Sequence, residues 1–509
     1  MTSYPRTITL ARRGMTLVEM LVATTCTLIL MGAIAQVFGA FGNAVSDSRS
    51  MIELDNRLRT VSWRLRNDLA GATARTLPPL EVEAGEGYLE IVEGPRNDAR
   101  DNNGASLPVA DLVGDIDDVL LFTTRNTETP YLGRYDNDPF NPSVTKTMES
   151  QLAEVSWFLR PTPDVSGVQT YTLFRRQLLV AGYIGFAPFY GDTYPNAVVF
   201  DAAVGYPANA SGHLPANNYS AFSSWGGFFD CFDLSVKRTD ARFPPVLLLP
   251  NTLADLTRRE NRFMHNNAGD VDAPVDGFPP FAAGLTTPTF VFPDGTSYQA
   301  MTPPDGLVFT GTGLHPRIGE DVILTNVLAF DIRVFDPAAP VKVRDDLALV
   351  PLDPDFDAAG AGPVVANGAY VDLGWGSGPV SATLAGSPHA PRFADLGDRR
   401  SGLRPPTRAA GTCTYDTWST HYESNGFNDD VVLGDTITDQ AADGLDNDTR
   451  DPITSAVVPA NGFIDDRAEM ETLPPYSAAL RGIEIRLRCY EPSSRQVRQV
   501  TIRHSFVPR

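Results

Sequence analysis

Residues 14–47 read GMTLVEMLVATTCTLILMGAIAQVFGAFGNAVSD, and this stretch decides how the chain begins to fold. From Met20 to Ser46 the sequence contains no charged side chain, and Asp47 is the first one after that run. A helix of this length would span roughly 40 Å, whereas the hydrocarbon core of a bilayer needs only about 20 apolar residues. The sequence therefore predicts a helix that crosses a membrane.

Three arginines, Arg6, Arg12 and Arg13, precede the apolar run, and no acidic residue accompanies them before Glu19. Positive charge beside a membrane span favours the cytoplasmic side. We therefore expect the amino terminus to stay in the cytoplasm and the rest of the chain to lie on the other side of the membrane.

An apolar stripe continues beyond the uncharged run. Its residues recur three or four positions apart, as on one face of a helix, with charged residues between them. Pro78-Pro79 ends this pattern, and no proline interrupts it earlier. We predict one continuous helix made of a membrane-spanning part, residues 15–46, and an amphipathic stalk, residues 47–77, which packs on a soluble head, residues 78–509. The stripe consists of Met51, Leu54, Leu58, Val61, Leu65 and Leu69.

Short apolar runs and period-two alternation replace the helical pattern in the head. Turn-forming residues join two pairs of these runs into hairpins, so the predicted fold class is α+β: a long amino-terminal helix packed on an antiparallel β-sheet. Residues of about 182–319 and 338–478 are rich in Gly, Pro, Asn and Asp, and we interpret them as two large loop-rich insertions. Strands are predicted at 118–124, 154–160, 170–179, 322–335, 482–490 and 497–506.

The string RGMTLVEM at residues 13–20 resembles the class III leader site of type IV pilins and type II secretion pseudopilins. The resemblance implies that residues 1–14 are a leader, which a prepilin peptidase removes after Gly14 before it methylates the new amino terminus at Met15. It also implies that Glu19 pairs with the amino group of a neighbouring subunit during assembly. A carboxylate inside an apolar helix is costly unless it is paired, which agrees with that role.

The head is similar, more loosely, to that of J-type minor pseudopilins and PilW-like minor pilins. The likeness lies in Val-x-x-Phe-Leu at 155–159, Leu-Phe-Arg-Arg at 173–176 and the final hairpin. It implies a single-pass inner-membrane protein with a periplasmic head, which acts in the tip or initiation complex of a pseudopilus or pilus. The partners expected from it are other pilins or pseudopilins, the prepilin peptidase and the inner-membrane assembly platform.

Three other interpretations stay open. Ala33-Ile34-Ala35 would be the cleavage site if the segment were an ordinary secretory signal peptide. A single-span anchor that is never processed would leave the string at residues 14–19 without a purpose. The chain would instead be a membrane-tethered envelope enzyme or ligand-binding protein if the insertions carried an activity of their own.

The composition argues against two classes of function. The formal net charge is −21, and beyond the first residues the sequence shows no cluster of Lys and Arg, so nucleic acid is not expected as a partner. Six histidines show no zinc-binding spacing, and no G-x-S-x-G nucleophile motif occurs. We therefore expect a protein that is not an enzyme.

Four cysteines are present, and Cys26 lies inside the apolar run. The other three, Cys231, Cys413 and Cys489, are widely spaced and form no C-x-x-C pair. One disulfide among them would suit an oxidising compartment, and the sequence leaves its pairing open.

Two acidic segments near the carboxyl terminus predict a calcium site. Calcium takes six to eight oxygen ligands from turn-forming stretches in which Asp and Asn alternate with Gly. Residues 443–448 read DGLDND and residues 461–466 read NGFIDD, so Ca²⁺ is the one cofactor expected. A solvated acidic loop is the alternative, because twelve residues interrupt the pattern. The predicted ligands are Asp443, Asp446, Asp448, Asp465 and Asp466.

Overall fold

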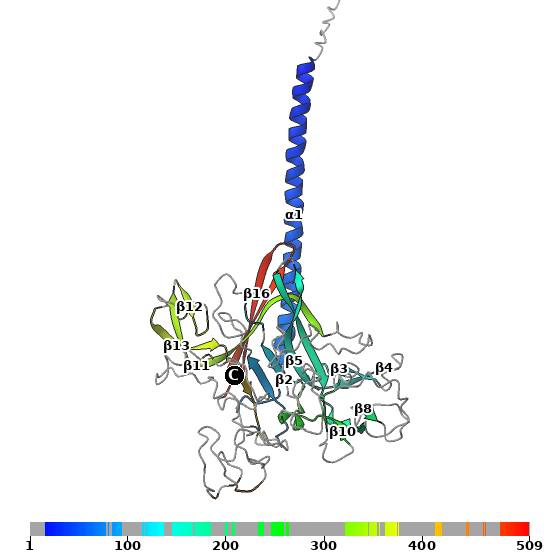
Figure 1. Ribbon diagram of the computed structural model, residues 1–509, viewed down its shortest axis with the longest axis vertical. Helices are drawn as coiled ribbons and strands as arrows, with labels where there is room; N and C mark the ends of the chain where they lie inside the picture. Colours follow the sequence, from blue (N-terminus) through cyan, green and yellow to red (C-terminus); the bar gives the residue numbers. More distant parts are fainter. Residues whose placement is uncertain are drawn as a thin grey trace, which may run out of the picture.

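The structure is a computed structural model in which one long helix projects from a head built of β-strands (Figure 1). The described residues are 16–77, 80, 84–93, 114–116, 118–136, 145–165, 168–184, 199–201, 206–208, 233–238, 246–258, 261–263, 321–344, 346–353, 356, 362–373, 375, 413–419, 444–446, 462, 464 and 479–507.

The helix, α1, runs over Leu17–Ala70 without a break and is 54 residues long. Thr16 caps its amino end in a capping box with Glu19, in which each side chain accepts a hydrogen bond from the other residue's backbone N–H. The predicted long helix is thereby confirmed. Its end is different from the prediction, because the helix stops at Ala70 rather than at residue 77.

Gly71 explains the early end of α1. A Cβ atom built there would lie 2.4 Å from the carbonyl oxygen of Arg125, so the chain passes too close to a neighbouring strand for any side chain. The Arg125 N–H donates to the carbonyl of Gly71 at 2.7 Å, and Ala72 forms a bridge with Thr124. Contacts with the sheet therefore end the helix before Pro78 is reached.

The head is organised around one large sheet in which every strand pair is antiparallel. Its order is β14-β1-β2-β5-β6-β11-β15-β16, and β12 and β13 both pair with β11. The α+β fold class is thereby confirmed. The strands are β1 Leu89–Glu93, β2 Val119–Arg125, β5 Leu152–Val165, β6 Val168–Leu179, β11 Val322–Arg344, β12 Leu347–Leu349, β13 Val364–Val371, β14 Cys413–Asp416, β15 Gly482–Glu491 and β16 Gln496–Ser505.

The predicted strands all lie in this sheet, and the two predicted hairpins are β5–β6 and β15–β16. One boundary was wrong, because β11 does not end at Asp336-Pro337 but continues to Arg344. Its register against β13 shifts between Asp336 and Pro340, and such an irregularity lets a strand pass residues that lack an N–H.

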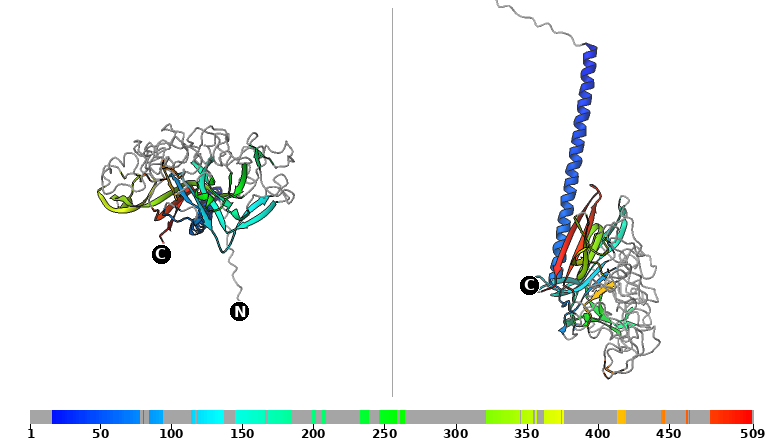
Figure 2. Two further views of the ribbon diagram at one scale, coloured as in Figure 1. Left: turned by 90° about the horizontal axis from the view of Figure 1, so that it is seen from below. Right: turned by 90° about the vertical axis from the view of Figure 1, so that its left-hand side faces the viewer.

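The carboxyl-terminal half of α1 packs on the sheet, where it contacts β16, β15, β2 and β11. Figure 2 shows the lower part of the helix standing against the red strands of the β15–β16 hairpin. All six residues of the predicted stripe are buried, and Val61, Leu65 and Leu69 are at most 2% exposed. The amphipathic pattern thus fixes which face of the stalk meets the head.

Smaller elements surround the main sheet. A hairpin of β3 Tyr131–Asp136 and β4 Thr145–Ser150 lies beside it, and a four-stranded sheet has the order β8-β7-β10-β9. The strands β13 and β14 fall within residues 338–478 yet belong to the main sheet, so this region supplies core strands as well as loops. The remaining elements are β7 Val199–Asp201, β8 Tyr206–Ala208, β9 Val236–Arg238, β10 Val246–Pro250 and the short 3₁₀ helices η4 Gly182–Ile184 and η6 Asp255–Thr257.

Candidate functional sites

Among the residues that the structure describes, nothing buries the amino-terminal half of α1. It is the one described helix that is long and apolar enough to span a membrane, and none of its most apolar window is buried. Leu17, Leu28 and Phe38 are each more than 70% exposed. Apolar surface of this extent is unfavourable in water, so this half of the helix must lie in lipid or against other chains.

Glu19 sits one turn inside this apolar helix. Its Oε2 accepts hydrogen bonds from the backbone N–H of Thr16 at 2.9 Å and from the Thr16 hydroxyl at 3.1 Å, and the Glu19 N–H donates to that hydroxyl at 3.2 Å. The carboxylate is exposed, so a cationic group from another molecule can approach it. Gly14 and Met15 lie outside the described residues.

A family model described as the prokaryotic N-terminal methylation motif matches residues 10–35. This motif marks type IV pilin-like proteins, and in this chain it covers the start of α1. No curated protein and no solved structure matches the chain. The matched span of the pilin-like protein contains Gly14, Met15 and Glu19, and the individual role of each stays a prediction.

A buried ion pair joins the last turn of α1 to the sheet. The Arg175 guanidinium on β6 donates from Nε to Oδ2 of Asp68 at 2.7 Å and from Nη2 to Oδ1 at 2.9 Å. Trp157 on β5 donates from Nε1 to the same Oδ2 at 3.2 Å. Asp68 is 2% and Arg175 3% exposed at the side chain, so this contact is dry and fixes the helix at one register against the head.

Sequence reasoning did not find the partner of Asp68. A signal was present, because an aspartate next to Leu69 falls on the buried face of the helix and therefore requires a cation. The arginine that supplies it lies 107 positions later in the chain, and no local pattern identifies it.

A second buried network links both inserted regions to the main sheet. Arg262 donates from Nη1 to Glu90 on β1 at 3.0 Å and to Asp416 on β14 at 2.8 Å, and all three side chains are fully buried. The guanidinium lies 4.2 Å from the ring centre of Tyr88. Burial would lower the pKa of Arg262, but Asp416 and Glu90 raise it above its ordinary value. Arg262 therefore remains charged and has a structural role, because it joins the segment at residues 261–263 to β1 and β14.

Glu154 lies next to this network on β5. Its carboxylate accepts hydrogen bonds from the Tyr88 hydroxyl at 2.6 Å, the Ser235 hydroxyl at 2.6 Å and the Phe263 N–H at 2.8 Å. Burial raises the pKa of Glu154, although these hydrogen bonds oppose the shift. The arrangement connects three distant segments through one buried carboxylate, so it stabilises the packing of those segments on β5.

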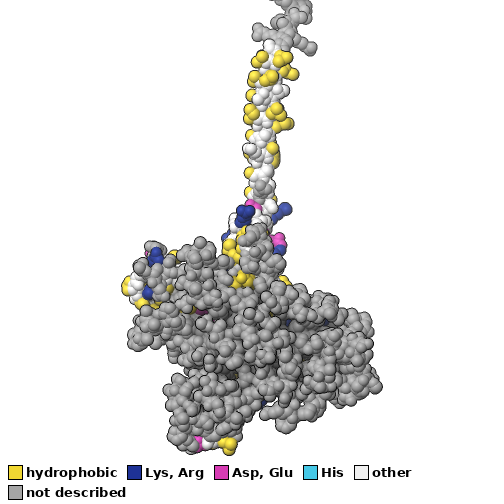
Figure 3. All heavy atoms as spheres, in the orientation of Figure 1, with side chains coloured by type: hydrophobic (Ala, Val, Ile, Leu, Met, Phe, Trp, Pro, Cys, Tyr) yellow, Lys and Arg dark blue, Asp and Glu magenta, His cyan; other side chains and the backbone are white. Residues whose placement is uncertain are grey.

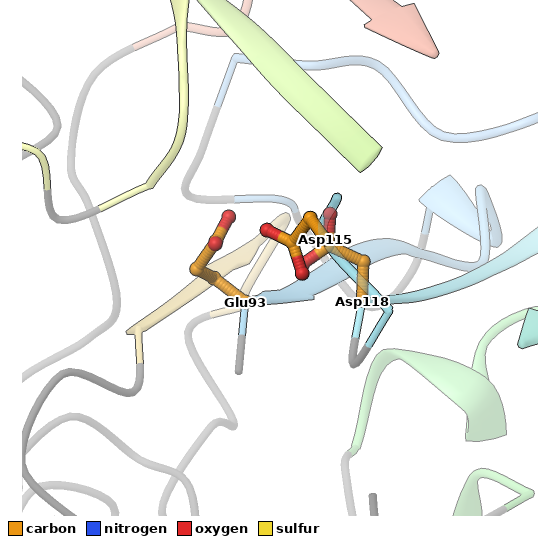
Figure 4. Close-up of side chains that lie close together, drawn as sticks. All are labelled: Glu93, Asp115 and Asp118. Atoms are coloured by element: carbon orange, nitrogen blue, oxygen red, sulfur yellow. The ribbon is translucent and has the colours of Figure 1, made fainter. Parts of the chain in front are cut away.

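Three buried carboxylates meet at the end of β1 (Figure 4). Glu93, Asp115 and Asp118 each place an oxygen within 4.8 Å of the others, and none is more than 2% exposed. The Ile332 N–H donates to Asp118 at 2.6 Å, and the Leu373 N–H donates to Glu93 at 3.2 Å. Carboxylate oxygens suit a hard divalent cation, but Ca²⁺ takes six to eight ligands, so these three residues do not by themselves define a site.

No local pattern in the sequence predicts this cluster, because the antiparallel pairing of β1 with β2 brings its residues together. Val92 on β1 lies opposite Val119 on β2, and this register brings Glu93 next to Asp118. The residues are separated by a stretch without a recognisable motif, so their approach depends on the sheet alone.

Of the five predicted calcium ligands, the structure describes Asp446, and this residue connects the two acidic segments. Oδ2 of Asp446 accepts a hydrogen bond from the Gly462 N–H at 2.8 Å, which connects the DGLDND and NGFIDD segments across the interruption. Both Gly444 and Gly462 have positive φ, as tight turns require. The other four predicted ligands, Asp443, Asp448, Asp465 and Asp466, lie outside the described residues.

The cysteines can be assigned in part. Cys489 is a free thiol on β15 with no exposed surface, and burial raises its pKa to about 12. Cys26 is also a free thiol, exposed on the apolar half of α1. Cys231 and the side chain of Cys413 lie outside the described residues. Cys489 is therefore not part of a disulfide in this structure, and the remaining possible pair is Cys231 with Cys413.

Proposed function

We propose that this pilin-like protein is a minor pilin or pseudopilin, a structural and non-catalytic subunit of a type II secretion pseudopilus or a type IV pilus. The observation that carries the proposal is the division of α1 into two halves. The half that carries the methylation motif is exposed and apolar, while the other half is fixed to a folded head. Such a helix can exchange lipid for the helices of other subunits without disturbing the head.

Assembly follows from this division. The prepilin peptidase cleaves after Gly14 and methylates Met15, and the apolar helix then leaves the membrane and packs among its neighbours. The carboxylate of Glu19, held toward the helix start by Thr16, meets the amino terminus of an adjacent subunit and sets the axial register. Ion pairing in a low-dielectric environment supplies the specificity for that register.

The protein would reside in the inner membrane with its head in the periplasm, and it would enter a periplasmic or surface filament. Its partners would be other pilins or pseudopilins, the prepilin peptidase and the inner-membrane assembly platform. A head that extends from residue 78 to residue 509 is large for close stacking of subunits, which supports a place at the filament tip or in the initiation complex.

We also propose Ca²⁺ as a structural ligand of residues 443–466. The hydrogen bond from Gly462 to Asp446 supports this proposal, because it brings the two acidic segments to one place. The ion would bind through Asp443, Asp446, Asp448, Asp465 and Asp466 and hold this loop before the final hairpin.

Mass spectrometry of the amino terminus of the protein purified from its native cells tests the main proposal. A mature chain that begins at N-methylated Met15 is expected. A chain that retains residues 1–14 or begins after Ala35 would refute filament processing and favour a plain anchor or a signal peptide.

Two variants extend this test to the rival function of a tethered envelope enzyme or ligand-binding protein. Gly14→Ala is expected to leave the precursor uncut and to abolish assembly. Glu19→Val is expected to be cut normally but to assemble poorly. A tethered enzyme would tolerate both changes, because neither alters the head.

A further inference from the structure

We propose that the outward face of the stalk is a docking surface for the acidic stalk helix of a different pilin-like subunit. We define the outward face as Arg49, Ile52, Arg59, Trp63 and Arg66. This inference rests on the proposed function, since it names the partner that α1 meets when the filament forms.

Two large apolar side chains on the stalk point away from the head. Ile52 is 59% and Trp63 68% exposed, although both belong to a regular helix whose opposite side is buried. They are eleven positions apart, which places them about 20° apart around the helix and about 16 Å apart along it. Val61, which is buried against the sheet, points about 180° away from Ile52.

The same line of side chains continues into the apolar half of the helix. Phe41 precedes Ile52 by eleven positions, as Ile52 precedes Trp63, and Phe41 is 67% exposed. The three residues therefore form one straight row about 33 Å long that begins in the membrane-spanning part and ends beside the head. An eleven-residue spacing keeps a row in line on a nearly straight helix, so a second helix can follow it over its whole length.

Arginines accompany the row on the stalk. Arg49, Arg59 and Arg66 are exposed and lie within about 60° of Ile52 around the helix. Asp55 lies at the border of this face, and its carboxylate is 3.8 Å from Arg498 on β16. Figure 3 shows Lys and Arg side chains on the stalk just above the head. The outward face is thus basic in a chain whose net charge is −21, and it is complementary to a helix that carries Asp or Glu.

A second copy of this chain fits the face poorly. Two copies that met through this face would bring three arginines of one copy against the three of the other. The acidic residue at the border, Asp55, already lies 3.8 Å from Arg498, so like charges disfavour self-association. A lipid surface fits poorly as well. Trp63 lies about 25 Å beyond Ser46, the last residue of the uncharged run, whereas the headgroup layer adds only about 5–8 Å to each side of the hydrocarbon core.

Photo-crosslinking with the full-length chain in its native cells tests the proposal. Benzoylphenylalanine at position 63 is expected to crosslink to a second protein with its own N-terminal methylation motif. The crosslinked peptide is expected to lie in the stalk of that protein and to contain Asp or Glu. A crosslink to a second copy of this chain, a crosslink to lipid, or no crosslink in assembled filaments would overturn the proposal.

Charge reversal gives an independent readout. Arg59→Glu combined with Arg66→Glu is expected to lower the crosslink yield about tenfold, because like charges then face the partner. Arg481→Glu serves as the control. This arginine is exposed, and it follows Leu480, whose N–H donates to Thr76 beyond the carboxyl end of α1, so it is not part of the outward face and the yield should not change. Equal yields in both variants would show that charge does not select the partner.

The failure of this inference can be separated from the failure of the proposed function. If the mature chain begins at methylated Met15 and enters filaments, the proposed function stands. A missing crosslink at position 63 in those same filaments then refutes the docking surface alone. Trp63→Ala should leave the thermal midpoint of the head unchanged, because the side chain is 68% exposed.

Discussion

Replacing Asp68 by alanine should destabilise the head far more than any substitution on the exposed side of the stalk. The change removes both hydrogen bonds that Arg175 makes to this carboxylate and the one from Trp157. It also leaves a guanidinium with 3% side-chain exposure without its counter-ion. Breaking a buried pair in this way costs about 3–5 kcal/mol of unfolding free energy.

The expected change can be measured as a shift of the thermal midpoint in detergent micelles, followed by near-ultraviolet circular dichroism. For a cooperative unit of roughly 200–400 residues, the loss corresponds to a decrease of about 4–12 °C. Glu53→Ala is the matched control on the same helix, because its pair with Arg57 is 65% and 51% exposed. An exposed pair of this kind contributes only about 0.3–0.5 kcal/mol.

A double variant distinguishes two contributions to the destabilisation, the loss of the Asp68 carboxylate and the burial of an unpaired Arg175 charge. Asp68→Leu with Arg175→Met removes both ions and keeps apolar bulk, so it should recover most of the stability that Asp68→Ala loses. If Asp68→Ala cost no more than Glu53→Ala, the buried pair would not be what fixes the stalk to the head.

Three further predictions concern buried groups and the metal. Because the pKa of Glu154 is raised above its ordinary value of 4.5, the folded state binds its proton more tightly than the unfolded state. The free energy of unfolding should therefore fall as the pH rises from about 4.5 through the folded pKa of Glu154. In Glu154→Gln, thermal unfolding measured from pH 4 to 8 should not show this contribution to the decrease. A maleimide should modify Cys489 at neutral pH only after unfolding, as judged by peptide mapping, because the thiol is buried and has a pKa of about 12. Chelation of Ca²⁺ should lower the thermal midpoint of the natural chain but not of Asp446→Asn; if Asp118→Asn abolished the response instead, the ion would lie at the buried cluster rather than in the loop.

The parts of this fold that the sequence predicted are those that depend on near neighbours in the chain. The stalk stripe follows from side chains three or four positions apart, and the hairpins β5–β6 and β15–β16 follow from alternation on either side of a turn. Pro78-Pro79 predicts an end for α1 that is too late, because the helix stops at Ala70. The close approach of Gly71 to Arg125, a tertiary contact, ends the helix earlier.

The contacts that sequence reasoning missed join residues far apart in the chain. Arg262 meets Glu90 across 172 positions and Asp416 across 154 positions, and its own surroundings contain no motif. The register between β1 and β2 brings the carboxylates of Glu93 and Asp118 together. Alternation of side chains shows which residues of one strand share a face, but it does not show which residues of another strand lie opposite them. The two acidic segments near the carboxyl terminus follow a local spacing, so the sequence alone is enough to predict a calcium site there, and calcium binding stays a prediction.

Each end of α1 carries a carboxylate that needs a partner in a low-dielectric environment, and the two ends differ in where that partner comes from. Asp68 at the carboxyl-terminal end is paired with Arg175, so its charge is neutralised inside the chain. In the part of the chain that the structure describes, Glu19 at the other end is hydrogen bonded to Thr16, whose groups are neutral. Neutral donors offset less of the cost of a carboxylate in a low-dielectric environment than a cation does. Arg175 thus supplies the cation for Asp68 within the head. Glu19 still requires a cation when its end of the helix lies in a low-dielectric environment, which favours pairing with the amine of another subunit.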